Sequence, residues 1–283
     1  MRGRAARQST GLVEVSSLDS EVRTLAALTP PLKWAGGKRW QVPLLRDLWE
    51  PHRHRRLVEP FCGGLAVALG LRPKRALIND ANAHLINFYR WVRRGLSIKV
   101  PMQNNADLFY AQRKRFNELV AAGQEQTVEA ASLFYYLNHT GYNGLCRFNR
   151  SGFFNVPFGR YATIDYKWSF DEYRPALQTW VLTTGDFGAC QLDPDDFVYA
   201  DPPYDVEFTA YSAGGFGWSD QLRLAQSLAR HPGPVVLVNQ ATERIEALYR
   251  DLGYRVKYLS APRRISCNGD RDHAREVMAL RNA

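Results

Sequence analysis

The sequence predicts an α/β protein whose mostly parallel sheet is interrupted by a largely helical insertion. Three observations support this. Strand-like segments alternate with helix-like ones from residue 56 onward, the apolar run Phe197–Ala200 stops at Asp201-Pro202-Pro203-Tyr204, and the composition changes between residues 106 and 166. Strands that alternate with helices form βα units around a parallel sheet. The 283 residues are enough for one large or two small domains.

The elements before the insertion follow one another at short spacing. Residues 1–28 show no hydrophobic periodicity, and we expect them to form a mobile tail. Two strand–helix units then follow, with a glycine turn in the first: strand Arg56–Phe61, turn Cys62–Gly64, helix Leu65–Leu71, strand Arg75–Asp80 and a helix from Ala83 to Arg93.

The middle of the chain differs from its flanks. Residues 106–138 favour long helices, and residues 139–166 are rich in Gly, Asn, Arg, Tyr and Phe. Strand candidates then return: Trp180–Thr184, Phe197–Ala200, Val235–Asn239, Arg255–Leu259 and Val277–Leu280. We therefore predict an α/β domain made of residues 29–93 and 176–283, with residues 94–175 inserted as a second, mostly helical domain.

Composition restricts the class of protein. The net charge of +9 is compatible with a polyanionic partner such as nucleic acid. No apolar run reaches about 18 residues, which argues against a membrane span, and no apolar stretch follows the arginines of residues 1–8, which argues against a secretory signal. The four cysteines (Cys62, Cys146, Cys190 and Cys267) lie far apart, which suits a reducing, cytoplasmic compartment rather than a zinc site or disulfides.

The segment Asp201–Tyr204 is the strongest candidate for a chemical site. Two prolines end the strand, because they cannot continue a hydrogen-bonded ladder, and they leave a stiff tip rich in acceptors. A flat ring could stack on Tyr204 while its amino group donates to Asp201 and to a backbone carbonyl. The alternative is an ordinary turn after a strand.

A glycine turn and a second acidic residue suggest a nucleoside site. Cys62-Gly63-Gly64 follows the first predicted strand and lacks the GxGxxG pattern of dinucleotide-binding folds. Asp80 ends the second strand, where a carboxylate commonly accepts the two ribose hydroxyls. The alternative role for Asp80 is to cap the helix that follows it, and the two roles are compatible.

Two further segments carry chemistry-bearing residues. In Lys33–Lys38, Trp34 offers a flat wall and Lys38 a cation for a small zwitterion, although a helix entry with surface lysines is the alternative. The basic-aromatic loop, residues 138–161, combines Arg and Asn with aromatic residues, which read and replace DNA bases. A packed loop with solvated arginines is the alternative there, and we expect Leu145, Val156 and Phe158 to be partly buried in either case.

The order of these motifs resembles that of Dam-type DNA adenine-N6 methyltransferases. KWAGGK, EPFCGG, IND, YNGLCRFN…GFFNVPFGRY, DPPY and RRISCNG follow one another over residues 31–282. The resemblance implies a Rossmann-like class I methyltransferase sheet with an antiparallel C-terminal hairpin. It also implies that residues 94–175 form a DNA target-recognition domain. S-adenosylmethionine would be the methyl donor, without a metal, and duplex DNA the substrate, within GATC in the enzymes whose loop is most similar.

The resemblance also assigns residues to roles. It implies a catalytic tip at Asp201, Pro202, Pro203 and Tyr204. It implies cofactor contacts by Trp34, Lys38, Phe61, Gly63, Asp80, Asp186, Phe187 and Asp201. It implies DNA contacts by Tyr142, Asn143, Leu145, Arg147, Asn149 and Pro157, and closure over the target base by Arg263–Gly269. Phe148, where related loops often have Tyr, and the acidic segment Asp270–His273 depart from the pattern.

We therefore expect the transfer of a methyl group to N6 of a flipped adenine in duplex DNA. The alternatives are a catalytically silent DNA-binding relative, or an N-methyltransferase that acts on an RNA base or a protein glutamine. N-methyltransferases that act on RNA bases or protein glutamine more often carry Asn in place of Asp201, and they lack the KWAGGK and YNGLCRFN segments. The sequence leaves open whether a cognate restriction endonuclease acts separately, and we expect a monomer.

Overall fold

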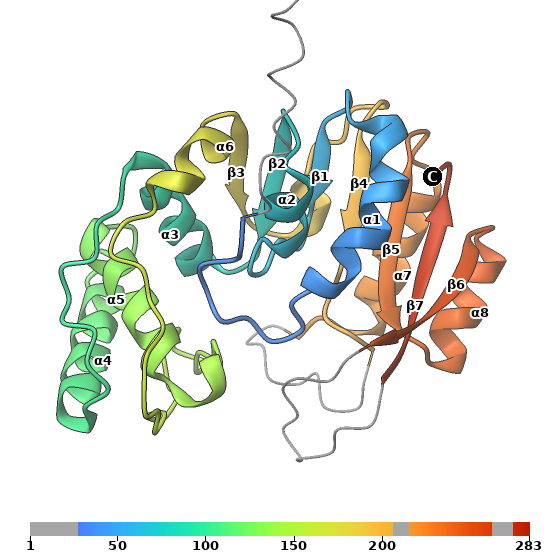
Figure 1. Cartoon of the computed structure of the whole chain (residues 1–283). Coiled ribbons are helices and arrows are strands. Elements are labelled where there is room, and N and C mark those ends of the chain that lie inside the picture. Colours follow the sequence, from blue (N-terminus) through green and yellow to red (C-terminus); the bar gives the residue numbers. More distant parts are fainter. Residues whose placement is uncertain (1–27, 206–214, 262–273) are drawn as a thin grey trace, which may run out of the picture.

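The structure is a computed structural model that describes residues 28–205, 215–261 and 274–283. Its strands are β1 (Leu57–Glu59), β2 (Ala76–Asp80), β3 (Trp180–Thr184), β4 (Phe197–Ala200), β5 (Val235–Gln240), β6 (Arg255–Ala261) and β7 (Ala274–Arg281). Its α-helices are α1 (Val42–Trp49), α2 (Ala66–Leu71), α3 (Ala83–Arg94), α4 (Ala106–Ala121), α5 (Val128–Thr140), α6 (Arg174–Gln178), α7 (Trp218–Ala229) and α8 (Glu243–Asp251). Figure 1 shows the sheet at the centre of the molecule.

The seven strands form one sheet in the order β3-β2-β1-β4-β5-β7-β6. β1 pairs in parallel with β2 and with β4, and β4 pairs in parallel with β5. β7 runs antiparallel between β5 and β6. The predicted α/β fold, with a mostly parallel sheet and an antiparallel C-terminal hairpin, is confirmed, and every predicted strand lies at its expected place.

The sheet has a hydrophobic core on each face, because consecutive side chains of a strand point to opposite faces. In β4, Phe197 and Tyr199 join the core beneath α1 and α3, whereas Val198 and Ala200 join the core beneath α7 and α8. All four are buried, as expected for a central strand covered on both sides. The short run Phe197–Ala200 thereby carries the catalytic candidate Asp201 on a rigid support.

Helix α3 begins at a side-chain cap. Asn82 accepts hydrogen bonds from the backbone N–H groups of His84 and Leu85, so Asn82, and not Asp80, is the N-cap. The alternative interpretation of Asp80 as the cap of this helix is therefore wrong, and the Asp80 carboxylate lies at the end of β2 instead.

Helices α4 and α5 follow α3 and pack against each other to one side of the sheet (Figure 1). α5 is buried over most of its length and packs against α3, where Phe88 and Tyr135 stack with ring centroids 5.6 Å apart. The division at residues 94 and 175 stays a prediction. Within the described ranges, no helix has the length and apolarity needed to cross a membrane.

Residues 28–38, which we call the N-terminal strap, join the insertion to the sheet. Lys33 and Asn138 exchange two hydrogen bonds, from the Lys33 N–H to Asn138 Oδ1 (2.9 Å) and from Asn138 Nδ2 to the Lys33 carbonyl (2.8 Å). The His139 ring contacts the Pro31 carbonyl at 3.0 Å, and the Tyr173 hydroxyl donates to the Thr29 carbonyl at 2.7 Å. The strap is thus held by residues more than 100 positions away.

Candidate active site

The candidate site lies where β1 and β4 end. The strand order reverses between these two neighbours, and ligands of open α/β sheets bind at such a switch point, beyond the carboxyl ends of the strands. Glu59, Asp80 and Asp201 stand at the ends of β1, β2 and β4. Because β7 is antiparallel to β5, Glu276 near its start lies opposite Gln240 at the same edge. The topology thus gathers four carboxylates.

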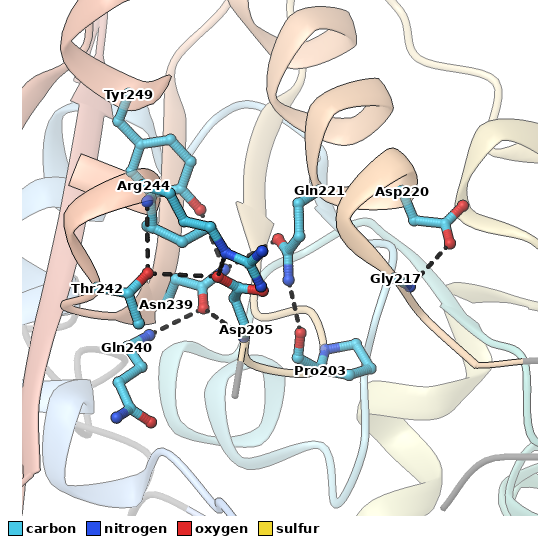
Figure 2. A network of polar contacts seen from close by, with 11 residues as sticks. Pro203, Asp205, Gly217, Asp220, Gln221, Asn239, Gln240, Thr242, Arg244 and Tyr249 are labelled. Carbon is cyan, nitrogen blue, oxygen red and sulfur yellow. Dashed lines mark hydrogen bonds and ion pairs between the residues drawn. The ribbon is translucent and has the colours of Figure 1, made fainter. Parts of the chain in front are cut away.

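Two buried amides fix the backbone of the tip (Figure 2). Gln221 Nε2 of α7 donates to the Pro203 carbonyl at 2.9 Å. Asn239 Nδ2 of β5 donates to Gln221 Oε1 at 3.0 Å, and Asn239 Oδ1 accepts the Asp205 N–H at 3.2 Å. The Pro203 carbonyl is therefore occupied, whereas no described residue donates to the Pro202 carbonyl.

An ion pair anchors the end of the tip. The Arg244 guanidinium makes two hydrogen bonds to the buried Asp205 carboxylate, which also accepts from the Thr242 hydroxyl at 3.3 Å. The same guanidinium lies 4.7 Å from the ring centre of Trp218. These contacts hold α7 and α8 against the residue that follows Tyr204 (Figure 2).

The Asp201 side chain is 20% exposed, and its carboxylate is only half compensated. Its Oδ2 lies 3.1 Å from Lys38 Nζ, while its Oδ1 is buried without a hydrogen-bond partner among the described residues. Burial raises the pKa of Asp201 to about 6, although the charge of Lys38 opposes this increase. An unpaired acceptor that is ionised at neutral pH suits an amino group as ligand.

Lys38 is 5% exposed and belongs to the site. Its ammonium group donates to the Gly36 carbonyl at 2.9 Å and lies 3.8 Å from Glu276 Oε1. It also lies over one face of the Tyr204 ring, 4.7 Å from the centre. The alternative interpretation of this residue as a surface lysine is therefore wrong.

The Asp80 carboxylate forms a second pole of the site. It accepts the N–H groups of Gly63 (3.0 Å) and Asn82 (2.9 Å), one on each oxygen. Burial raises the pKa of Asp80, and these two amide hydrogen bonds oppose the increase. The predicted pair of a glycine turn and an acidic strand end thus forms direct contacts.

Aromatic rings lie beside this pole. The rings of Phe61 and Phe187 are 5.4 Å apart, and Arg223, paired with Asp186 at 2.6 Å, lies over Phe187. Trp34 packs closely against the glycine turn, since a Cβ added to Gly63 would lie 2.7 Å from Trp34 Nε1. Phe61 and Phe187 supply an apolar wall, and Trp34 requires glycine at position 63.

The basic-aromatic loop folds on itself through side-chain contacts. Arg147 Nε donates to Asn155 Oδ1 at 2.8 Å, and Asn149 Oδ1 accepts the N–H groups of Ser151 and Phe153, both at 3.0 Å. Asn149 therefore shapes the turn with its oxygen, which leaves its amide NH₂ for any contact with a ligand.

The other residues predicted at the DNA lie at the start and end of this loop. Tyr142 is 51% exposed, Asn143 is exposed and has a left-handed backbone with φ of 52°, and Pro157 is exposed. The Tyr142 N–H donates to the Pro157 carbonyl at 2.9 Å, so the two ends of the loop meet. Leu145 and Phe158 are partly buried, as predicted, whereas Val156 is fully buried, which is more than predicted.

Sequence reasoning missed four polar residues that shape the site: Glu59, Gln221, Asn239 and Glu276. All four are buried. A weak signal existed for three of them, because Glu59 lies within a predicted strand, Asn239 ends one and Glu276 directly precedes one. The predicted closing segment Arg263–Gly269, the acidic Asp270–His273 and the tail up to residue 27 lie outside the described residues. In the parts that the structure describes, no group of three or more His, Cys, Asp or Glu side chains could hold a metal ion.

Comparisons with known proteins point to one family. The model of the D12 class N6 adenine-specific DNA methyltransferases matches residues 34–265. A DNA adenine methylase of Vibrio cholerae serotype O1 is 33% identical over 274 residues, which cover 88% of this chain and 94% of that protein. A type II methyltransferase, M.CviBI, of Paramecium bursaria Chlorella virus NC1A is 31% identical over 230 residues, 78% of this chain and 86% of that protein. A DNA N-6-adenine-methyltransferase of Escherichia phage P1 is 34% identical over 88% of this chain, which spans only 35% of the phage protein.

Proposed function

The chain belongs to the family of D12 class N6 adenine-specific DNA methyltransferases, and we propose that the tip of β4 holds the adenine that it methylates. Adenine N6 lies inside the duplex, so the base must rotate out of the helix to reach a protein group, at a cost of a few kcal/mol. Tyr204 would recover part of that cost by stacking on the flipped base, about 1–3 kcal/mol. Lys38 covers one face of the Tyr204 ring, so the base would stack on the other.

The observation that carries this proposal is a pair of free acceptors at the tip. Asp201 Oδ1 is buried without a described partner, and the Pro202 carbonyl receives no hydrogen bond from a described residue. An amino group has two hydrogens, and these two oxygens would accept one each. When these two oxygens accept both N6 hydrogens, the lone pair is localised on the nitrogen and would point toward the methyl group that N6 attacks. The Gln221 amide supports this choice, because it already occupies the Pro203 carbonyl.

The residues around Asp80 fit S-adenosylmethionine. Asp80 Oδ1 accepts one amide and keeps a lone pair for a ribose hydroxyl, whereas Oδ2 accepts the Gly63 amide and, at 4.0 Å, the weakly donating Cys62 thiol, which a second ribose hydroxyl would displace. Phe61 and Phe187 offer an apolar surface to an adenine ring. Glu59 Oε1 is buried without a described partner, which suits the ammonium group of the methionine portion. When bound, this cofactor supplies an electrophilic methyl group on a sulfonium centre.

Methylation releases one proton from N6, and Asp201 is its first acceptor. Asp201 is ionised at neutral pH because its pKa is about 6, and it already accepts a hydrogen bond from the amino group. The remaining contribution of the protein is positioning, which can supply most of the rate when the reacting atoms are held in line. The tip is suited to that task, since the Gln221 and Asn239 amides hold its backbone.

We further propose that residues 94–175 form the DNA-binding part, with GATC as the recognition sequence. Tyr142 and Asn143 are exposed at the start of the basic-aromatic loop. Arg150 and Arg160 are exposed and form no ion pair with any described residue, as expected of side chains that meet phosphates. Asn155 accepts from Arg147 Nε and, through its carbonyl, from Arg147 Nη2 at 3.3 Å, and these contacts orient a guanidinium whose remaining N–H groups could read guanine. The charge of +9 favours binding to DNA in general.

Replacing Asp201 with alanine tests the proposed catalytic role. We expect Asp201→Ala to lose transfer of a tritiated methyl group from S-adenosylmethionine to duplex DNA, while DNA binding is retained. Asp195→Ala is the matched control, because Asp195 is exposed and paired with Arg55 on the loop before β4. Full activity of Asp201→Ala would refute the mechanism. Sequencing of modified bases in DNA from expressing cells tests GATC separately.

A further inference from the structure

A second carboxylate, that of the buried Glu276, lies near Lys38. Glu276 Oε1 lies 3.8 Å from Lys38 Nζ, and the Glu276 side chain is only 7% exposed. Its other oxygen accepts a hydrogen bond from Gln41 Nε2 at 2.9 Å, and Gln41 Oε1 in turn accepts from the Tyr199 hydroxyl at 3.0 Å. Glu276 is thus held in place from two sides and cannot turn away from the ammonium group.

Two carboxylates therefore share one buried cation. Lys38 lies closer to Asp201, at 3.1 Å, than to Glu276, at 3.8 Å. If Lys38 were paired with Asp201 alone, Asp201 would be a weak acceptor of the N6 proton, because a neighbouring cation stabilises the ionised carboxylate. The Glu276 carboxylate acts in the opposite sense on Asp201, since like charges repel. The cluster carries a net negative charge when all three groups are ionised.

We propose that Glu276 is a positioning residue that draws part of the Lys38 charge away from Asp201 and so keeps Asp201 basic enough to take the N6 proton. This role rests on the proposed function of Asp201. Glu276 touches neither substrate in this scheme and acts through Lys38. Its place on β7, opposite Gln240 in the register with β5, brings it to the site by strand pairing alone.

Other ionisable groups face Asp201 and must be considered. Tyr204, Tyr199, Tyr249 and Glu59 each interact with its charge. Burial raises the pKa of all three tyrosines, so they stay neutral below pH 10, and they do not titrate in the range where Asp201 does. Burial raises the pKa of Glu59 to about 8, so its titration falls above that of Asp201. Lys38 and Glu276 are the remaining charged partners.

The test is the pH dependence of single-turnover methylation with saturating S-adenosylmethionine and duplex DNA. We expect Glu276→Gln to shift the acidic limb of the profile to lower pH by about half to one unit, and to lower the plateau rate about threefold to tenfold because Asp201 becomes a weaker base. Lys38→Met should shift the same limb to higher pH. Loss of structural support alone would not shift the acidic limb to lower pH in Glu276→Gln and to higher pH in Lys38→Met.

Two further variants complete the design. Glu246→Gln is the control, because Glu246 lies on α8, is paired with Arg250 and changes the net charge by the same amount. Glu276→Asp keeps the negative charge and should keep the acidic limb near that of the wild type, which also covers the case in which Glu276→Gln does not fold. An unmoved limb in a folded Glu276→Gln, or a limb displaced as far in Glu276→Asp, overturns the proposal. Absence of N6 methylation by the wild type would instead refute the proposed function.

Discussion

Replacing Glu59 with glutamine should stabilise the folded protein at neutral pH. Glu59 is 1% exposed at the end of β1, and its Oε1 has no hydrogen-bond partner among the described residues. Burial raises its pKa from 4.5 to about 8, the amide of Ala68 opposes this increase, and the charge of Asp201 adds to it. The folded protein therefore keeps a proton that the unfolded chain has released.

The magnitude follows from the difference between the two pKa values. The stability is fully present below pH 4.5 and is lost as the pH rises toward 8, because the folded state binds more protons than the unfolded state in this range. From pH 4.5 to pH 7 the wild type loses roughly 3 kcal/mol, at about 1.4 kcal/mol for each pH unit. Glutamine does not titrate and avoids this loss.

Urea unfolding of both proteins without cofactor, at pH 5 and pH 7, measures the effect. We expect the free energies of unfolding to differ by less than about 1 kcal/mol at pH 5 and by roughly 3 kcal/mol at pH 7, with Glu59→Gln the more stable. Contributions of other titrating groups cancel in the difference. Glu118→Gln changes an exposed position of α4. Its difference from the wild type in the free energy of unfolding should not increase between pH 5 and pH 7. An equal difference at both pH values would refute the reasoning.

Two further predictions concern the tip and the loop. Gln221→Leu should lower the single-turnover rate constant of methyl transfer about tenfold with little change in the Kd for DNA, because the Pro203 carbonyl loses its donor and the tip its fixed direction. An unchanged rate constant in the single-turnover assay would contradict this. Arg147→Ala should lose about 1–3 kcal/mol of discrimination at one base pair, whereas Asn155→Ala should lose less because only the orientation of Arg147 is released. Competition between oligonucleotides that differ at one position measures both, and an unchanged preference in Arg147→Ala would remove that residue from the set that reads DNA.

Local patterns made much of the fold predictable. The run Phe197–Ala200 had to be a buried strand, because it is apolar on both faces and two prolines stop it. Asp80 and the glycine turn were predicted together, since both follow parallel strands and must meet at one edge. The methyltransferase family and its activity, predicted from the order of the motifs, are confirmed by the family model.

The charges beneath the tip were not predictable in the same way. Glu276 meets Lys38 only because β7 inserts between β5 and β6, a pairing that no local pattern encodes. The Gln221 and Asn239 amides join α7 to β5 through side chains whose partners lie 18 residues apart. Polar residues at such positions look like surface residues in a sequence, since burial of a paired polar group depends on tertiary contacts alone.

The N-terminal strap has a consequence for the order of events during synthesis. Its hydrogen-bond partners lie 105 to 144 residues further along the chain, at Asn138, His139 and Tyr173. β1 likewise pairs with β4, which lies about 140 residues later in the sequence. Closing such long loops is entropically slow, so the strap cannot dock until the insertion has left the ribosome. The strap and the β4-facing edge of β1 therefore both lack these partners until the later segments have been synthesised.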